Sequence, residues 1–397
     1  MANVSKRLAS LSSSQTIAMN QKSNDLKAQG VDVINLSVGE PDFPTPDHIK
    51  KAAHDAIDAN FSFYAPVAGY PDLKQAIVKK FKVENNLDYT VDQIVVSNGA
   101  KHSLANVVLS IIDPGDEVIV PAPFWVSYIE QVKLAEGVNI IVDTTIEDGF
   151  KMSPAQLEAA ITPKTKALMI CSPSNPTGAV YSKEELAGLV KVLEKHPRVI
   201  VIADEIYEHI NFVGKHVSIA EFPSIKDRVV VINGVSKAYA MTGWRIGYMA
   251  APLWITKECV KLQGQVTSGA TSNAQRAALH ALTSDQTCVS DMNKAFLRRR
   301  DLVISRISKM KGVNCAIPEG AFYVFPDMSS FYGKSFEGTK INGSMDLCVF
   351  LLGTGHIATV PGEAFGAENC IRISFANSDE NLTKAMDRLE NALSLLK

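Results

Sequence analysis

Six short runs rich in Val and Ile constrain the fold of this chain more than any other feature. They are continuous rather than alternating with polar residues, and they occupy residues 93–97, 116–121, 138–143, 166–172, 198–204 and 228–233. Strands buried on both faces of a parallel sheet have this pattern. We therefore expect six such strands.

Helical patterns lie between these runs. In the clearest, residues 182–196, four aliphatic residues from Leu186 to Leu193 recur at helical spacing. Ser182 and Glu185 form a capping box at its start. Strand and helix thus alternate, which predicts an α/β fold with a large, mostly parallel sheet flanked by helices.

The pattern changes after about residue 283. A long charged helix is expected over 291–310, then short strands at 321–327 and 369–376, and a closing helix from 379. The 397 residues exceed what one hydrophobic core usually supports. We predict a large domain, 46–282, and a smaller α+β domain formed by 1–45 with 283–397. The arginines at 298–300 are interpreted as one solvated helix face.

Charge and cysteine usage narrow the class of protein. The 40 basic and 42 acidic residues leave a formal charge of -2, which offers no broad field for nucleic acid or an anionic membrane. The six cysteines form no CxxC pair, the first residues lack the apolar core of a signal peptide, and no apolar run reaches membrane-spanning length. The sequence therefore predicts a cytoplasmic protein with reduced thiols and only local anion recognition.

Unusual residues follow five of the predicted strands. Ligands bind at the carboxyl ends of strands in open α/β sheets, so these residues are expected to converge. A glycine turn before a helix can hold a phosphate through free N–H groups. Each residue alone has an ordinary structural interpretation, but together they form a set: Gly99 and Ala100, Trp125, Asn175, Asp204 with Tyr207, and Ser236 with Lys237. The set suits pyridoxal phosphate, a flat anionic ring that bonds to an amine.

Longer motifs extend this interpretation along most of the chain. They include "INLSVGEPDFPTP" (34–46), "SNGAKHSL" (97–104), "PFWVSY" (123–128), "SPSNPTGAVY" (172–181), "ADEIYEHI" (203–210), "GVSKAYAMTGWRIGY" (234–248), "EGAFYVF" (319–325) and "IRISFANS" (371–378). On these motifs the chain resembles the class I aminotransferases of the fold-type I pyridoxal-phosphate enzymes. It is most similar to the prokaryotic aspartate aminotransferases of subgroup I-beta.

The resemblance implies a role for each residue around the cofactor ring. Lys237 would bond to the cofactor and carry the proton, which requires a lowered pKa. Asp204 would hold a proton on the pyridine nitrogen. Asn175 and Tyr207 would donate hydrogen bonds to the phenolic oxygen, and Trp125 would stack on the ring.

The resemblance also implies how the phosphate is held. Backbone N–H groups, a hydroxyl and a forked guanidinium would contact it, and the site would lie at a homodimer interface that receives a tyrosine from the partner. A serine that many relatives carry three residues before the lysine is replaced here by Gly234. The implied phosphate ligands are Gly99, Ala100, Lys101, Ser236, Arg245 and, from the partner, Tyr64.

Substrate recognition follows from the same resemblance. Arg372 would bind the α-carboxylate as a bidentate pair, with Gly39 as a backbone donor beside it and Trp125 and Asn175 lining the pocket. Lys101 would bind a distal carboxylate, because it stands where the I-beta aspartate enzymes carry a lysine just after the phosphate turn. The alternative, an exposed first-turn lysine, is disfavoured because a cation at a helix N-terminus opposes the helix dipole. We therefore expect transamination in two half-reactions, from L-aspartate to 2-oxoglutarate.

Several alternatives stay open. An aminotransferase for aromatic amino acids or prephenate, or one of broad specificity, would share the cofactor motifs. The same fold also serves as a non-catalytic effector module in transcription regulators, but the first 33 residues are too few for a winged helix. A nicotinamide dehydrogenase would show GxGxxG after an early strand, and none is present.

Overall fold

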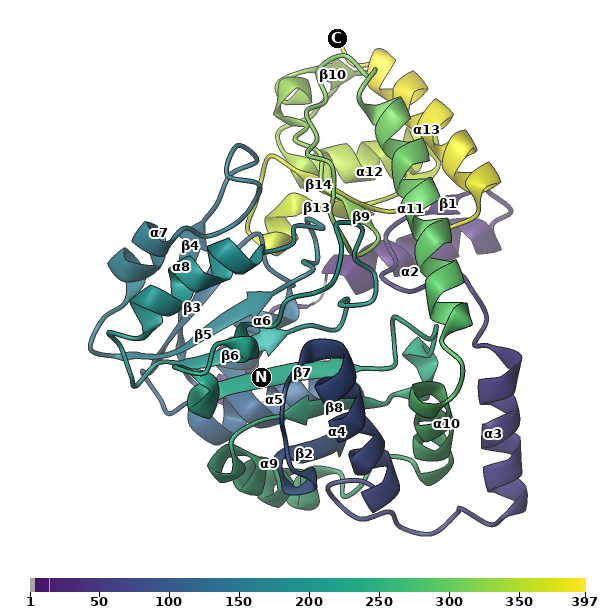
Figure 1. Ribbon diagram of the computed structural model, residues 1–397. Coiled ribbons are helices and arrows are strands. Elements are labelled where there is room, and N and C mark those ends of the chain that lie inside the picture. Colours follow the sequence, from purple (N-terminus) through teal and green to yellow (C-terminus); the bar gives the residue numbers. More distant parts are fainter. Residues whose placement is uncertain (1–3, 14) are drawn as a thin grey trace.

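The computed structural model describes residues 4–13 and 15–397. Its centre is a sheet in the order β2-β8-β7-β6-β5-β3-β4 (Figure 1). Strand β8 runs antiparallel to both neighbours, and the other pairs are parallel. The strands are β2 (Ile94–Ser97), β3 (Glu117–Ala122), β4 (Val138–Asp143), β5 (Thr165–Cys171), β6 (Ile200–Asp204), β7 (Val229–Gly234) and β8 (Gly247–Ala250). All six predicted runs are strands, and the expected α/β class is confirmed.

Helices cover both faces of this sheet. Alternate residues of a strand point to opposite faces, so Ile202 packs in one apolar cluster while Val201 and Ala203 pack in the other. The first face is covered by α5 (Ala100–Ile111), α6 (Ser127–Leu134) and α9 (Leu253–Val266). The second cluster includes α3 (Asp47–Asp58), α4 (Pro71–Asn85), α7 (Pro154–Ala160), α8 (Lys183–Leu193) and α10 (Ser272–Thr283). The predicted capping box of Ser182 and Glu185 begins α8.

Strand β4 departs from the expected burial on both faces. Val138 and Ile141 are 45% and 41% exposed. The expectation was wrong here because β4 is the last strand of the sheet and pairs only with β3. An edge strand retains solvent on part of its surface even when its sequence is apolar.

A separate apolar cluster joins the two ends of the chain. Strand β1 of the N-terminal part pairs with β12 of the C-terminal part, and Met19 packs among C-terminal side chains. The predicted domain boundaries at residues 46 and 283 stay predictions. The helices are α2 (Gln15–Ala28), α11 (Thr287–Ile307), α12 (Ser344–Gly355) and α13 (Asp379–Ser394), and the strands are β1 (Ile34–Asn35), β9 (Tyr323–Val324), β12 (Ile357–Ala358), β13 (Val360–Pro361) and β14 (Ile371–Ser374). Helix α1 (Lys6–Ala9) and the hairpin of β10 (Ser335–Phe336) and β11 (Thr339–Lys340) complete these elements.

The arginines at 298–300 do not form one solvated face. Arg299 is only 6% exposed, and its two terminal nitrogens bind both carboxylate oxygens of Asp42 at 2.7 and 2.9 Å. Arg298 is exposed and binds Asp379. The interpretation was wrong for Arg299 because its partner lies far away in sequence, in the segment after β1. The pair therefore holds that segment against α11.

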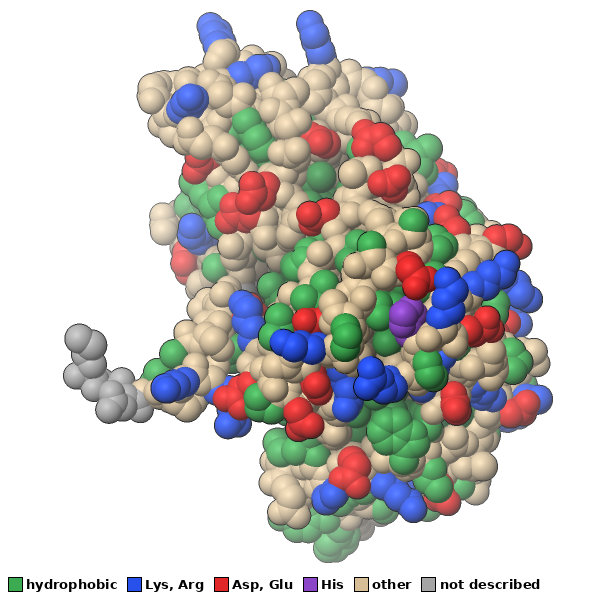
Figure 2. Space-filling view, turned by 90° about the vertical axis from the view of Figure 1, so that its left-hand side faces the viewer, with side chains coloured by type: hydrophobic (Ala, Val, Ile, Leu, Met, Phe, Trp, Pro, Cys, Tyr) green, Lys and Arg blue, Asp and Glu red, His purple; other side chains and the backbone are tan. Residues whose placement is uncertain are grey.

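Basic and acidic side chains are intermingled over the face in Figure 2. The six cysteines are free. Among the described residues, no helix combines the length and the apolar character that crossing a membrane requires.

Candidate active site

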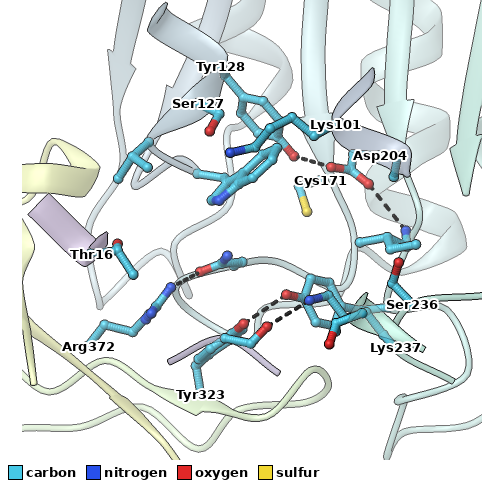
Figure 3. Close-up of a pocket in the computed structure, with 18 of the residues that line it drawn as sticks. Thr16, Lys101, Ser127, Tyr128, Cys171, Asp204, Ser236, Lys237, Tyr323 and Arg372 are labelled. Carbon is cyan, nitrogen blue, oxygen red and sulfur yellow. Dashed lines mark hydrogen bonds between the residues drawn. The ribbon is translucent and has the colours of Figure 1, made fainter. Parts of the chain in front are cut away.

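A pocket of about 270 Å³ lies where the loops after the parallel strands converge (Figure 3). Arg372 and Gly39 reach it from outside the central sheet. Tyr64 does not line it, and Gly99 lies directly behind Arg245. The pocket is lined by all the other predicted residues: Ala100, Lys101, Trp125, Asn175, Asp204, Tyr207, Ser236, Lys237 and Arg245.

The amine of Lys237 lies at the base of this pocket. Nζ donates a hydrogen bond of 2.7 Å to the backbone oxygen of Gly39. Burial lowers the pKa of Lys237 to about 8, partly opposed by the negative charge of Glu40. A lysine with this pKa is partly neutral near pH 7, so it can act as nucleophile and base.

Asp204 ends β6 and is buried. Tyr128 donates a hydrogen bond of 2.7 Å to Oδ2, and the backbone N–H of Ile206 donates one of 3.3 Å to Oδ1. Burial raises the pKa of Asp204 to about 6, although the Tyr128 hydrogen bond opposes the rise. A buried carboxylate favours a cationic partner, and a protonated ring nitrogen would provide one.

The turn between β2 and α5 provides the anion-binding end. Gly99 has φ 84°, and a Cβ there would lie 2.4 Å from a guanidinium nitrogen of Arg245. Arg245 is fixed by a hydrogen bond of 2.8 Å from Nη1 to the oxygen of Thr242. Ser236 is 5% exposed and lines the same pocket. A helix N-terminus, a guanidinium and a hydroxyl thus face one region, which fits the phosphate of the predicted cofactor.

Arg372 forms the opposite end of the pocket. It is 2% exposed and donates from Nη1 to Asn175 Oδ1 at 2.9 Å and from Nη2 to the oxygen of Ser37 at 2.6 Å. Its buried Nε has no hydrogen-bond partner in the described chain, so a donor remains for a carboxylate. Because Asn175 accepts through Oδ1, its NH₂ group is left as a donor.

Lys101 lies on another wall, at the start of α5. Its Nζ is 4.9 Å from the centre of the Trp125 ring, and the indole packs edge-on against Tyr128. Partial burial, with the nearby charge of Arg245, lowers the pKa of Lys101. An anionic ligand would stabilise the ammonium in this position.

Sequence reasoning missed several pocket residues. Tyr128 and Tyr323 stand inside motifs that carry the family resemblance, but nothing in the motifs shows where the phenols point. Thr16 enters from α2, and Cys171 ends β5 beside Tyr128 and Asn175. No sequence pattern signals Thr16, because it precedes the first motif.

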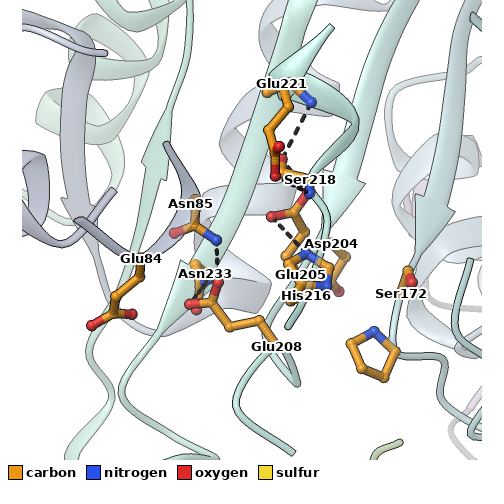
Figure 4. A network of polar contacts seen from close by, with 12 residues as sticks. Glu84, Asn85, Ser172, Asp204, Glu205, Glu208, His216, Ser218, Glu221 and Asn233 are labelled. Atoms are coloured by element: carbon orange, nitrogen blue, oxygen red, sulfur yellow. Dashed lines mark hydrogen bonds and ion pairs between the residues drawn. The ribbon is translucent and has the colours of Figure 1, made fainter. Parts of the chain in front are cut away.

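A buried polar network supports the loops behind the pocket (Figure 4). Glu208 accepts hydrogen bonds from Asn85 at 2.7 Å and Asn233 at 2.8 Å, and it forms an ion pair with Lys80. Asn233 in turn accepts a hydrogen bond of 2.7 Å from the N–H of Gly234. The network therefore connects α4 to the loop that carries Lys237.

Comparisons with known proteins agree with this geometry. A family model described as aminotransferase class I and II matches residues 31–389. The chain is 49% identical to a protein of Cereibacter sphaeroides named aspartate/prephenate aminotransferase, over 98% of each chain. The aspartate aminotransferase structure from Rhizobium meliloti superposes with a TM-score of 0.96, at 41% identity over 100% of both chains. That from Thermus thermophilus with maleate gives 0.93, at 40% identity over 99% of this chain and 100% of that one.

Proposed function

The chain belongs to the class I and II aminotransferases, which are pyridoxal-phosphate enzymes, and we propose that it moves an amino group from L-aspartate to 2-oxoglutarate, giving oxaloacetate and L-glutamate. The observation that carries this proposal is the placement of two cations, Arg372 and Lys101, on separate walls of one pocket. Aspartate and 2-oxoglutarate each carry two carboxylates. A pair of fixed cations matches such a substrate.

Each pocket residue that the sequence predicts has a task in this proposal. Pyridoxal phosphate, when bound, supplies an aldehyde carbon that accepts amino groups and a ring that withdraws electrons from the substrate's α-carbon. Lys237 Nζ takes the α-proton, since its lowered pKa leaves a neutral amine available. Asp204 holds a proton on the ring nitrogen through its buried carboxylate.

The remaining residues bind and orient. Asn175 Nδ2 and the Tyr207 hydroxyl donate to the phenolic oxygen of the cofactor, and Trp125 covers the ring. The phosphate is held by the backbone N–H groups of Gly99, Ala100 and Lys101, by the Ser236 hydroxyl and by the Arg245 guanidinium. Arg372 binds the α-carboxylate through its guanidinium, and its contacts to Asn175 and Ser37 fix the orientation.

Lys101 is assigned to the distal carboxylate. The Thermus thermophilus enzyme is described with maleate, which is a dicarboxylate. Prephenate as an alternative amino acceptor is favoured by the name of the Cereibacter sphaeroides relative. Prephenate also carries two carboxylates, so the same two cations would serve.

A panel of substrates tests the assignment. Aspartate, alanine and phenylalanine are compared as donors to 2-oxoglutarate, glutamate is tested as a donor to oxaloacetate, and prephenate is compared as an acceptor from aspartate. We expect Lys101→Ala to lower kcat/KM about 10- to 100-fold for aspartate and glutamate but little for alanine, because only the first two lose a charge-assisted hydrogen bond. Lys101→Arg should retain part of the preference.

A matched control is Lys133→Ala on α6, whose lysine pairs with Glu130 at 2.9 Å and does not line the pocket. It should leave all donors unchanged. Equal losses for monocarboxylic and dicarboxylic donors in Lys101→Ala would overturn the assignment. A strong preference for phenylalanine in the wild type would favour the aromatic alternative.

We also propose a cytoplasmic homodimer in which Tyr64 contacts the phosphate in the partner's pocket. Tyr64 and Phe63 are 96% and 79% exposed, and they line a surface cavity of their own with residues 269–273. Sedimentation gives the assembly state. Mixed dimers of Lys237→Ala and Tyr64→Ala subunits should regain about half of the wild-type activity, because one site then holds both native residues. No recovery would place Tyr64 in its own subunit's site.

A further inference from the structure

The hydroxyls of Tyr207 and Tyr323 lie 2.8 Å apart in the pocket, and either can donate to the other. Tyr207 follows β6, and Tyr323 begins β9 outside the central sheet. The two rings are 4% and 0% exposed. The pair therefore joins a residue proposed to contact the cofactor with one that has no assigned role.

The phenol of Tyr323 is held firmly. Tyr323 pairs with Ser374 of β14 in the small sheet, and the Arg372 guanidinium lies 4.6 Å from the centre of its ring. A Cβ on Gly39 would stand 2.6 Å from the Tyr323 oxygen. Gly39 thus provides the space in which this hydroxyl reaches Tyr207.

Proton counting fixes the direction of the bond once the cofactor is present. A phenol has one proton to donate and lone pairs that accept. If Tyr207 donates to the phenolic oxygen of the cofactor, as in the proposed function, it has no second proton for Tyr323. Tyr323 must then donate to Tyr207. Burial raises the pKa of both phenols, so both protons are retained.

We propose that Tyr323 is a positioning residue that donates to Tyr207 and so strengthens the hydrogen bond from Tyr207 to the cofactor's phenolic oxygen. Successive hydrogen bonds polarise one another in a low-dielectric site. A stronger donor stabilises negative charge on that oxygen, which lowers the affinity of the neighbouring lysine-linked nitrogen for a proton. Tyr323 would thereby lower the pH at which the bound cofactor changes protonation.

The inference rests on the proposed contact between Tyr207 and the cofactor, but it does not depend on the preferred amino acid. It is tested with the holoenzyme, by titrating the visible absorption of the bound cofactor with pH. Four proteins form a double-mutant cycle: the wild type, Tyr323→Phe, Tyr207→Phe and the double variant.

We expect Tyr323→Phe to raise the midpoint, changing the acid constant about two- to fourfold. Tyr207→Phe should raise it further, and adding Tyr323→Phe to Tyr207→Phe should change nothing more. Gly39→Ala, which keeps the phenol but displaces it, should raise the midpoint as Tyr323→Phe does. Tyr239→Phe is the control, because that hydroxyl donates to Gln286 outside the pocket and its loss should cause no shift.

Three results would overturn the inference: an unchanged midpoint in Tyr323→Phe, a downward shift, or the same upward shift in the Tyr207→Phe background. The last result would mean that Tyr323 acts independently of Tyr207. Failure of the aspartate preference in the donor panel, with the cycle as expected, would refute the substrate assignment and leave this inference standing.

Discussion

Tyr128 donates a hydrogen bond of 2.7 Å to Asp204 from α6, so two elements that flank the pocket meet at the carboxylate. The phenol is 2% exposed, and the carboxylate is 4% exposed. Within this contact the hydroxyl favours the charged form of Asp204, whereas burial favours the neutral form. The balance between them decides at which pH the site can hold a protonated ring nitrogen.

Tyr128→Phe should raise the pH at which cofactor affinity declines. Asp204 has a pKa of about 6, so its carboxylate is charged above that pH and neutral below it. Loss of a hydrogen bond to a charged group removes about 1.5–3 kcal/mol, which corresponds to about 1–2 pH units. The dissociation constant of pyridoxal phosphate, measured between pH 5 and 8, reports the change.

Titration of the cofactor's own phosphate is common to wild type and variant, so the difference between them isolates Asp204. Tyr181→Phe is the control. Its hydroxyl accepts a hydrogen bond of 2.8 Å from the N–H of Met152, and Tyr181 does not line the pocket. Identical midpoints in the wild type and Tyr128→Phe would contradict the role of the hydrogen bond.

Lys237 should capture the cofactor with a pH dependence centred near 8. Only the neutral amine attacks an aldehyde, so the rate for cofactor-free protein should rise about tenfold per pH unit below the midpoint and level off above it. Stopped-flow absorbance between pH 6 and 10 measures this rate.

Glu40→Gln sharpens this test. The charge of Glu40 raises the pKa of Lys237 against the larger effect of burial, so its removal should move the midpoint to lower pH. A wild-type midpoint near that of an ordinary lysine, about 10.4, would mean that burial does not perturb this amine.

Glu208→Gln should destabilise the protein more than the loss of an exposed ion pair. Although burial alone would raise the pKa of Glu208, Lys80, His209 and His216 together hold it well below its ordinary value. The depressed pKa contributes stability that is present above the unfolded-state value and is lost as pH falls toward the folded-state value. Removing the charge leaves the buried Lys80 ammonium with the neutral Asn85 Oδ1 at 2.8 Å and the partly exposed carboxylate of Glu84 at 3.6 Å, which we expect to cost about 3–5 kcal/mol.

Urea unfolding at pH 7 measures the loss. The control is Asp55→Asn, which removes the exposed pair with Lys51 on α3 and should change the free energy of unfolding little. Similar small changes in both variants would show that the ion pair of Glu208 does not stabilise the fold.

The fold was predictable where burial is continuous and local. Four of the six Val and Ile runs, β3, β5, β6 and β7, lie inside the sheet, where a strand has no solvent face to interrupt its pattern; β2 and β4 lie at its two ends. One strand and one helix start could not be predicted in this way. Strand β8 was not expected, because "GYMA" is short and lies inside a motif read for its chemistry. Helix α11 begins at Thr287 rather than 291, since its first turn lacks a strong start signal.

The candidate site was predictable wherever chain topology brings residues together. Asp204 ends β6 and Lys237 lies three residues after its neighbour β7, so their convergence follows from a parallel sheet. The contact between Tyr207 and Tyr323 could not be predicted, because it depends on how the loop after β6 packs against β9, where Tyr323 lies 116 residues further along the chain. The pairing of Arg299 with Asp42 could not be predicted for the same reason.

Gly99→Ala should weaken cofactor binding through Arg245 rather than through backbone strain alone. Gly115 provides a matched comparison: it has φ 86° against 84° for Gly99, but a Cβ there would meet nothing within 4 Å. Both alanine variants incur the cost of a positive φ, about 1–3 kcal/mol, and at Gly99 the ψ of 160° lies in a region that is essentially restricted to glycine. Only Gly99→Ala must displace the guanidinium, whose nitrogen lies 2.4 Å from the new atom.

The two variants should therefore differ in their affinity for pyridoxal phosphate, and Gly99→Ala should lose at least as much thermal stability as Gly115→Ala when cofactor-free. We expect the dissociation constant to rise about 10- to 100-fold in Gly99→Ala, as for the loss of one charge-assisted contact, and to stay near the wild-type value in Gly115→Ala. Inorganic phosphate should protect the wild type and Gly115→Ala against thermal unfolding, and Gly99→Ala less. Equal affinities in the two variants would show that Arg245 does not hold the phosphate from its position behind the glycine turn.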